Sequence, residues 1–137
     1  MDVHTKEQRS YNMSRIKSKN TKPETIIFEV LRLSKIKFRK HYPVPGKPDI
    51  AFPKLKIAVF IDGEFWHGKD FNDWKEKITH FWLDKIGKNI TRDKKNFNLL
   101  KKAGWTILRL WGRDVVKNPT KAYSKILKLL EKSYPGA

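Results

Sequence analysis

Two aspartates and a histidine in the middle of the chain have the side chains best suited to catalysis. Asp49 precedes one apolar stretch, Asp62 ends the next, and His67 follows five residues later. If the chain reverses between residues 55 and 56, Asp49 lies directly opposite Asp62, where Cβ atoms are roughly 5 Å apart. Two such carboxylates repel each other unless a cation lies between them, and Mg²⁺ sites typically combine one or two carboxylates with a substrate phosphate. A lone aspartate at a strand end is more often a solvated turn residue, but this combination favours a metal-dependent catalytic site.

The two apolar stretches predict a β-hairpin that positions these acids. Residues 50–52 form the first strand, Pro53 ends it, and residues 54–56 make the turn. Residues 57–61 form the second strand, and their uninterrupted apolar character is typical of a strand buried on both faces. The hairpin is therefore expected at the centre of a sheet.

Helices and further strands are expected on both sides of the hairpin. Thr21 is placed as the N-cap of a helix, with Glu24 at the position that completes a capping box. Glu24 therefore has two interpretations, a capping partner or an acid near the metal. Residues 38–44 predict an edge strand. A long helix follows residues 81–89 and ends at Gly104, residues 105–111 form a strand, and a last helix starts after Asn118.

This order of elements predicts an α/β fold with a mixed central β-sheet flanked by helices. We expect one domain over residues 21–137, preceded by a basic arm or helix over residues 1–20. The chain has 137 residues, enough for a single domain with its own core.

The charge balance points to a polyanionic partner. The formal net charge is +17, from 31 lysines and arginines against 14 aspartates and glutamates. An excess of this size favours nucleic acid binding, and Lys88 and Arg92 on the long helix are expected to contact DNA. There are no cysteines, which excludes disulfides and cysteine-based zinc sites. No stretch is apolar enough for a membrane span or a signal peptide, so we expect a cytoplasmic, nucleoid-associated protein.

Large apolar side chains near the predicted site could contact bases. Phe65 and Trp66 lie beside His67 on a glycine-flanked loop, where exposed rings would suit stacking on bases or insertion between them. The alternative is that both rings belong to the core. Met13, among basic residues, could likewise be a minor-groove wedge or a loosely packed side chain.

These residues resemble one family almost from end to end. The chain is similar to the very-short-patch repair endonucleases, a branch of the PD-(D/E)xK nuclease superfamily. The shared motifs are residues 12–16, 21–24, 45–49, 59–63, 65–67, 81–89 and 92–93, together with Gly104, Trp105 and Trp111. The combination of Phe-Trp-His after a strand with Trp-Leu-Asp-Lys-Ile-Gly-Lys-Asn is highly specific.

The resemblance implies a restriction-endonuclease-like fold and a Mg²⁺-dependent nickase, with one or two ions bound. Family members cut one DNA strand 5′ to the thymine of a T·G mismatch. Asp49 matches the metal-bridging aspartate, Ile61 the residue whose carbonyl joins the metal shell, and Asp62 a residue beside the scissile phosphate. The remaining matches are His67 as acid or base, Glu24 as an acid needed for activity, Asp93 near an acid that orients the histidine, and Phe65, Trp66 and Met13 as inserted side chains.

The chain also departs from the family pattern. Members often carry a structural zinc, but the matching positions here are Glu64, Lys69 and Phe71, so we expect no zinc and a loop held by packing. Glu64 could be a third metal contact or a solvated surface group.

The expected partner is double-stranded DNA with a mismatch, with mismatch-repair proteins as further candidates, and the protein is expected to be a monomer. Two rival functions remain. One is a nuclease of the same fold with a different lesion or mispair as target, and the other is a catalytically silent DNA-binding module.

Overall fold

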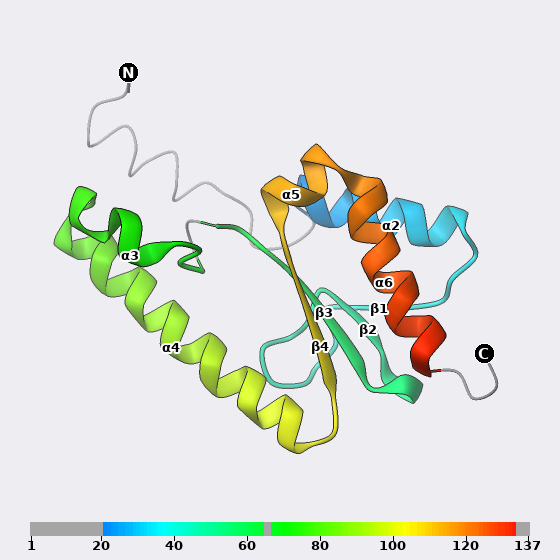
Figure 1. Cartoon of the computed structure of the whole chain (residues 1–137). Helices are drawn as coiled ribbons and strands as arrows, with labels where there is room; N and C mark the ends of the chain where they lie inside the picture. Colours follow the sequence, from blue (N-terminus) through cyan, green and yellow to red (C-terminus); the bar gives the residue numbers. More distant parts are fainter. Residues whose placement is uncertain (1–20, 65–66, 134–137) are drawn as a thin grey trace.

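A four-stranded sheet forms the centre of the protein, with helices on both of its faces (Figure 1). The structure is a computed structural model, and it describes residues 21–64 and 67–133. The elements in chain order are α2 (Lys22–Leu33), β1 (Arg39–Lys40), β2 (Ile50–Phe52), β3 (Ile57–Asp62), α3 (Phe71–Trp74), α4 (His80–Lys102), β4 (Thr106–Trp111), α5 (Gly112–Lys117) and α6 (Pro119–Ser133), with 3₁₀ turns at Pro53–Leu55 and Lys75–Lys77.

The sheet is mixed, as the sequence predicted. Its strand order is β1-β2-β3-β4; β1, β2 and β3 pair antiparallel, whereas β3 and β4 pair parallel. The parallel pair requires a crossover, and α4 supplies it. The α/β fold class with helices flanking a mixed sheet is thereby confirmed.

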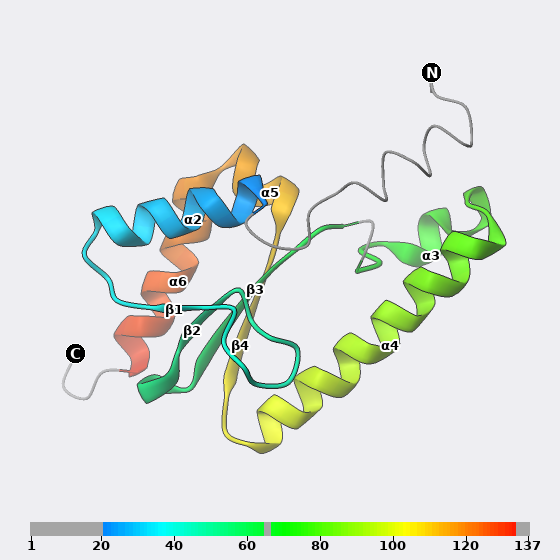
Figure 2. The ribbon, with the colours of Figure 1, turned by 180° about the vertical axis from the view of Figure 1, so that it is seen from behind.

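The two faces of β3 pack against different helices because its side chains alternate between them. Ile57, Val59 and Ile61 belong to the larger core beneath α2, α5 and α6. Ala58 and Phe60 face the other way, toward the C-terminal half of α4. Figure 2, seen from behind, shows that the N-terminal half of α4 extends beyond the sheet and carries α3.

The predicted hairpin exists, but its register differs from the expected one by two residues. Phe52 pairs with Ile57 and Ile50 with Val59, so continuing the ladder brings Asp49 beside Phe60. The expectation that Asp49 lies directly opposite Asp62 is therefore wrong. The reason is the 3₁₀ turn that starts at Pro53 and ends with a left-handed residue at position 56, which centres the reversal one residue earlier. A shift of two keeps each side chain on its face of the sheet.

Other sequence expectations need smaller corrections. The edge strand expected over residues 38–44 is only Arg39–Lys40, because the chain turns at His41, which has a positive φ of 48°. The helices α3 and α5 were not expected. Thr21 is the N-cap of α2, but it makes no side-chain capping hydrogen bond, so the predicted capping box does not form.

The C-terminal half of the chain follows the prediction closely. Gly104, with φ +89°, follows the end of α4, and the side chain of Asn118 accepts a hydrogen bond from the backbone of Lys121 at the start of α6. In the described parts of the chain, no helix is long and apolar enough to cross a membrane.

Candidate active site

Two clusters of carboxylates and a histidine lie at one end of the sheet. Within each cluster, one ligand atom from each residue lies within 4.8 Å of the others. The first cluster consists of Glu24, His41 and Asp49, and the second of Asp62, His67 and Asp93. They are assembled from elements far apart in the sequence, namely α2, the flanks of β1 and β2, the end of β3 with its following loop, and α4.

Asp49 is anchored to the neighbouring strand by its side chain. Its Oδ2 accepts a hydrogen bond of 2.7 Å from the backbone N–H of Ile61. Burial raises the pKa of Asp49 to about 8; the Ile61 hydrogen bond opposes this rise, and the nearby Glu24 and Asp62 carboxyls add to it. A cation bound beside this buried acid would favour its ionised form.

Asp62 differs from Asp49 because an arginine balances its charge. Arg109 Nε donates to Asp62 Oδ2 at 2.9 Å, and Arg109 Nη2 donates to Asp93 Oδ2 at 2.8 Å. The guanidinium lies 4.4 Å from the centre of the Trp111 ring, so its position is fixed on that side as well. Burial raises the pKa of Asp62, while His67 and Arg109 act against the rise.

His67 lies between the two acids of the second cluster. Its Nδ1 is 2.6 Å from Asp93 Oδ2, and its Nε2 is 3.5 Å from Asp62 Oδ1. An ionised Asp93 can only accept a hydrogen bond, so Nδ1 carries the hydrogen and Nε2 remains free to exchange a proton.

Gly68, the residue after His67, lies close against α4. The backbone N–H of His67 donates to the Gly63 carbonyl, and that of Lys69 donates to the Glu64 carbonyl. Gly68 has φ +71°, and a Cβ at this position would lie 2.3 Å from Ile90 Cδ1. The close approach to α4 therefore requires glycine, and it sets the distance between His67 and Asp93.

Glu24 points into the first cluster instead of capping α2. Its side chain is buried, its Oε2 has no hydrogen-bond partner, and it lies 4.0 Å from His41 Nε2. Of the two interpretations of Glu24, the structure excludes the capping bond. A buried carboxylate oxygen without a partner, beside a second carboxylate, has the chemistry of a divalent-cation ligand. The first cluster therefore fits a metal ion.

The side chain of Glu64 contacts the backbone of α5. Its Oε1 accepts a hydrogen bond of 2.8 Å from the backbone N–H of Arg113, in the first turn of α5. This contact satisfies one of the free N–H groups of that helix. Glu64 thus ties the loop after β3 to the helix after β4.

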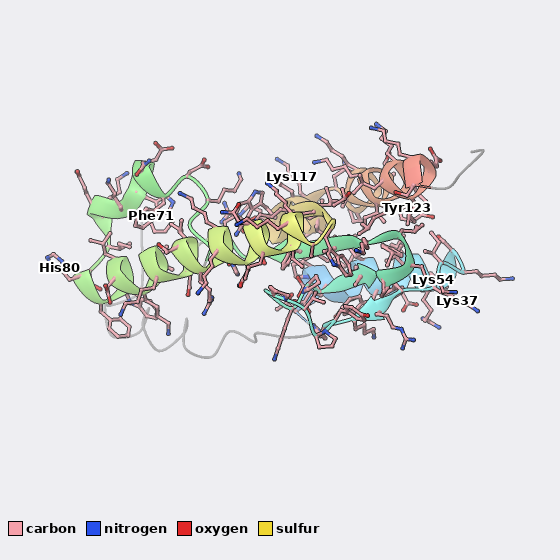
Figure 3. All side chains as sticks on the ribbon, turned by 90° about the horizontal axis from the view of Figure 1, so that it is seen from below. Lys37, Lys54, Phe71, His80, Lys117 and Tyr123 are labelled. Carbon is pink, nitrogen blue, oxygen red and sulfur yellow. The ribbon has the colours of Figure 1, made fainter. Side chains whose placement is uncertain are left out.

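The predicted DNA-contacting residues of α4 lie on its outer surface. Lys88 Nζ is 3.0 Å from Asp84, and Arg92 donates to Asn89 at 3.1 Å. Both side chains line an open groove of about 1110 Å³ between the segment 71–78 and α4. In Figure 3, Phe71 and His80 mark this end of the molecule, and Lys37 and Lys54 mark the opposite end. Met13, Phe65 and Trp66 lie outside the described residues.

Two residues of the site, Arg109 and His41, were not predicted from the sequence. Arg109 could have been noticed as a lone arginine in the otherwise largely apolar strand 106–111. His41 carried a weaker signal, because it lies in a basic segment whose strand was expected to continue past it. Both face the clusters only because non-local pairing brings their strands there.

Comparisons with known proteins agree on one group of enzymes. Residues 1–73 match the family described as DNA mismatch endonuclease Vsr. The chain is 45% identical over 130 residues to the Type II nicking enzyme V.NmeDIP of Neisseria meningitidis serogroup C, covering 92% of this chain and 88% of the relative. It is 44% identical over 135 residues to V.HpaIIP of Haemophilus parainfluenzae, with 95% and 96% covered. It is also 35% identical over 113 residues to the DNA mismatch endonuclease Vsr of Escherichia coli (strain K12), with 80% and 72% covered.

Proposed function

Because this chain belongs to the Vsr family of DNA mismatch endonucleases, we propose that it is a Mg²⁺-dependent nickase that cuts one DNA strand 5′ to the thymine of a T·G mismatch. Family membership makes it a DNA endonuclease; the metal and the mismatch belong to the proposal. The observation that carries the proposal is that a carboxylate cluster with the chemistry of a metal site and a histidine–aspartate pair lie together at one end of the sheet.

The first cluster supports the metal part of the proposal. Asp49 and Glu24 would hold the ion through carboxylate oxygens, with the Ile61 carbonyl and Asp62 as further candidates from the sequence. A bound Mg²⁺ would polarise the scissile phosphate and lower the pKa of an attacking water. The Ile61 N–H bond to Asp49 Oδ2 fixes the orientation of that carboxylate.

The second cluster supports a proton-transfer role for His67. Asp93 holds Nδ1, so Nε2 is the atom that takes a proton from water or gives one to the leaving oxygen. Arg109 keeps Asp62 and Asp93 in place on either side of the ring. His67 would therefore be a catalytic residue, and Arg109 a positioning residue.

Binding would depend on charge and on inserted side chains. The +17 net charge, with Lys88 and Arg92 on the surface of α4, favours contacts to backbone phosphates. Met13, Phe65 and Trp66 would open the base stack beside the mispair, which costs least where pairing is already poor.

The test is nicking of a duplex that differs from its control only in one T·G pair. The parent should cut the thymine strand with Mg²⁺ and stop when EDTA removes the ion. Asp49→Asn and His67→Ala should lose at least about a hundredfold in rate, whereas His80→Ala, an exposed histidine at the start of α4, should keep full activity. Unchanged cutting by both site variants would refute the proposed site.

The names of the relatives favour testing other targets as well, because some are called nicking enzymes without mention of a mismatch. A panel that varies only the mispair separates T·G specificity from another target. Cutting of a different mispair would keep the nuclease and replace its substrate. No effect of Mg²⁺ on any substrate would instead favour a silent DNA-binding module.

A further inference from the structure

His41 lies in the first cluster, with Glu24 and Asp49, but has no part in the function proposed above. It follows β1, and its backbone N–H donates to the Asp49 carbonyl at 3.2 Å. Its φ of 48° is in the left-handed region, which histidine adopts more readily than most residues. This conformation holds the imidazole with Nδ1 3.9 Å from Asp49 Oδ1 and Nε2 4.0 Å from Glu24 Oε2.

Two buried polar atoms face each other in this cluster without partners. They are Glu24 Oε2 and His41 Nε2, and Glu24 is only 2% exposed. Unpartnered buried polar atoms are costly, so an atom that binds both is expected. Their separation of 4.0 Å is too long for a hydrogen bond but no longer than two metal–ligand bonds of about 2.0–2.2 Å each. One ion between them could bind both atoms.

Within the described residues, no lysine or arginine supplies positive charge to the first cluster. In the second cluster, the guanidinium of Arg109 forms ion pairs with both Asp62 and Asp93 and so offsets part of their negative charge. In the first cluster, by contrast, Glu24 and Asp49 have only His41 at ion-pair distance among residues 21–64 and 67–133. The two clusters resemble each other in composition, but only the second contains an arginine among the described residues.

We propose that His41 is a ligand of the same metal ion as Glu24 and Asp49, and that this nitrogen ligand makes the site bind Mn²⁺ more tightly than Mg²⁺. The proposal rests on the metal site of the proposed function, but not on its reaction or substrate. Imidazole is a good ligand for first-row transition metals. Mg²⁺ prefers an octahedral shell of oxygens and keeps several waters. Two carboxylates and an imidazole therefore favour the transition metal.

The experiment measures metal binding by calorimetry on the full chain without DNA. The parent should bind Mn²⁺ about tenfold or more tightly than Mg²⁺. His41→Asn replaces the nitrogen with an amide oxygen, and asparagine tolerates the left-handed backbone that this position needs. This variant should lose most of the preference, through weaker Mn²⁺ binding with Mg²⁺ binding nearly unchanged. His80→Asn, at an exposed histidine on α4, should behave like the parent.

A second measurement tests the ligand directly in the parent protein, so its main result does not depend on how the variant folds. Electron spin echo spectroscopy of Mn²⁺ bound to the parent should show coupling to an imidazole nitrogen, and the coupling should be lost in folded His41→Asn. Equal binding of Mn²⁺ and Mg²⁺ by the parent, no Mn²⁺ binding, or an unchanged preference in His41→Asn would overturn the inference.

These failures are distinct from failure of the proposed function. If Asp49→Asn abolishes metal binding and nicking while His41→Asn changes neither, the nuclease site stands and His41 is not a ligand. If Asp49→Asn leaves metal binding and nicking unchanged, the metal site itself is refuted.

Discussion

The acids of the site differ in the positive charge that lies beside them, and this difference suggests different roles for the two clusters. Asp62 and Asp93 share the guanidinium of Arg109, which places a positive charge beside both carboxylates around His67. Asp49 has a carboxyl neighbour and no lysine or arginine partner within the described segments, so a bound cation would favour its ionised form. A guanidinium is planar and bridges two carboxylates, which a lysine ammonium cannot do with the same geometry.

Arg109→Lys should therefore slow nicking about 10- to 100-fold, as loss of an orienting contact typically does, while DNA affinity stays unchanged. Arg109 opposes the rise in the pKa of Asp62, and lysine keeps the charge but not the bridging hydrogen bonds, so the acid-side limb of the pH–rate profile should move to higher pH. Single-turnover nicking as a function of pH measures both effects. Arg32→Lys, at an exposed arginine of α2, is the matched control. A uniform loss of rate with an unshifted profile would mean that Arg109 is only structural.

The raised pKa of Asp49 predicts how stability changes with pH in the absence of metal. The carboxyl has its ordinary pKa of 3.8 in the unfolded chain and a pKa of about 8 in the folded protein, so the folded state holds the extra proton between these values. The stabilisation is fully present below a pH of about 4 and is lost as the pH rises toward 8. The free energy of unfolding falls by up to roughly 1.4 kcal/mol per pH unit in this range.

Urea unfolding in EDTA at pH values of about 5.5 and 7.5, both inside this window, measures the slope. Asp49→Asn should be less sensitive to pH than the parent by about the Asp49 contribution, because its amide does not titrate. Identical slopes in the two proteins would show that Asp49 ionises normally.

At the scale of elements, the sequence predicted the strands and helices better than their contacts. The apolar run 57–61 and the Gly104 and Asn118 signals are local, and each marks its element correctly. The register of the hairpin depended on the conformation of Pro53–Leu55, which sequence patterns do not specify. Arg109 and His41 could not be placed in the site because their positions depend on strand pairing across long sequence separations.

The loop that carries His67 provides a test of how α4 positions the site. Gly68→Ala puts a methyl group against Ile90 at a positive φ, so it should destabilise the fold by about 2 kcal/mol and displace His67 from Asp93. Gly87→Ala is the matched control, because a Cβ there has nothing within 4 Å and α4 gains helix propensity. In this second variant the free energy of unfolding should rise by up to about 1 kcal/mol. Thermal unfolding separates the two, and equal Tm values would contradict the packing argument.

On the scale of the whole molecule, the structure confirms the predicted fold class. The sequence could predict it because the fold class depends mainly on the order of strands and helices and on the apolar pattern of each. The domain layout stays a prediction, since residues 1–20 lie outside the description. The distribution of charge is a second property of the whole molecule. Exposed basic side chains extend from the His80 end to the Lys37 and Lys54 end (Figure 3). A long anionic polymer can therefore interact with the protein well beyond the site.

This distribution predicts steep salt dependence of DNA binding. If about five phosphates are neutralised, the logarithm of the association constant should fall against the logarithm of salt concentration with a slope of about −4.5. Affinity should then drop by roughly several hundredfold between about 50 and 200 mM salt. Fluorescence anisotropy with labelled duplex measures the slope. Lys88→Gln should reduce it by about one, because one phosphate contact is lost, whereas Asp49→Asn without metal should leave it unchanged. A slope near zero would show that the net charge of +17 does not engage the phosphates.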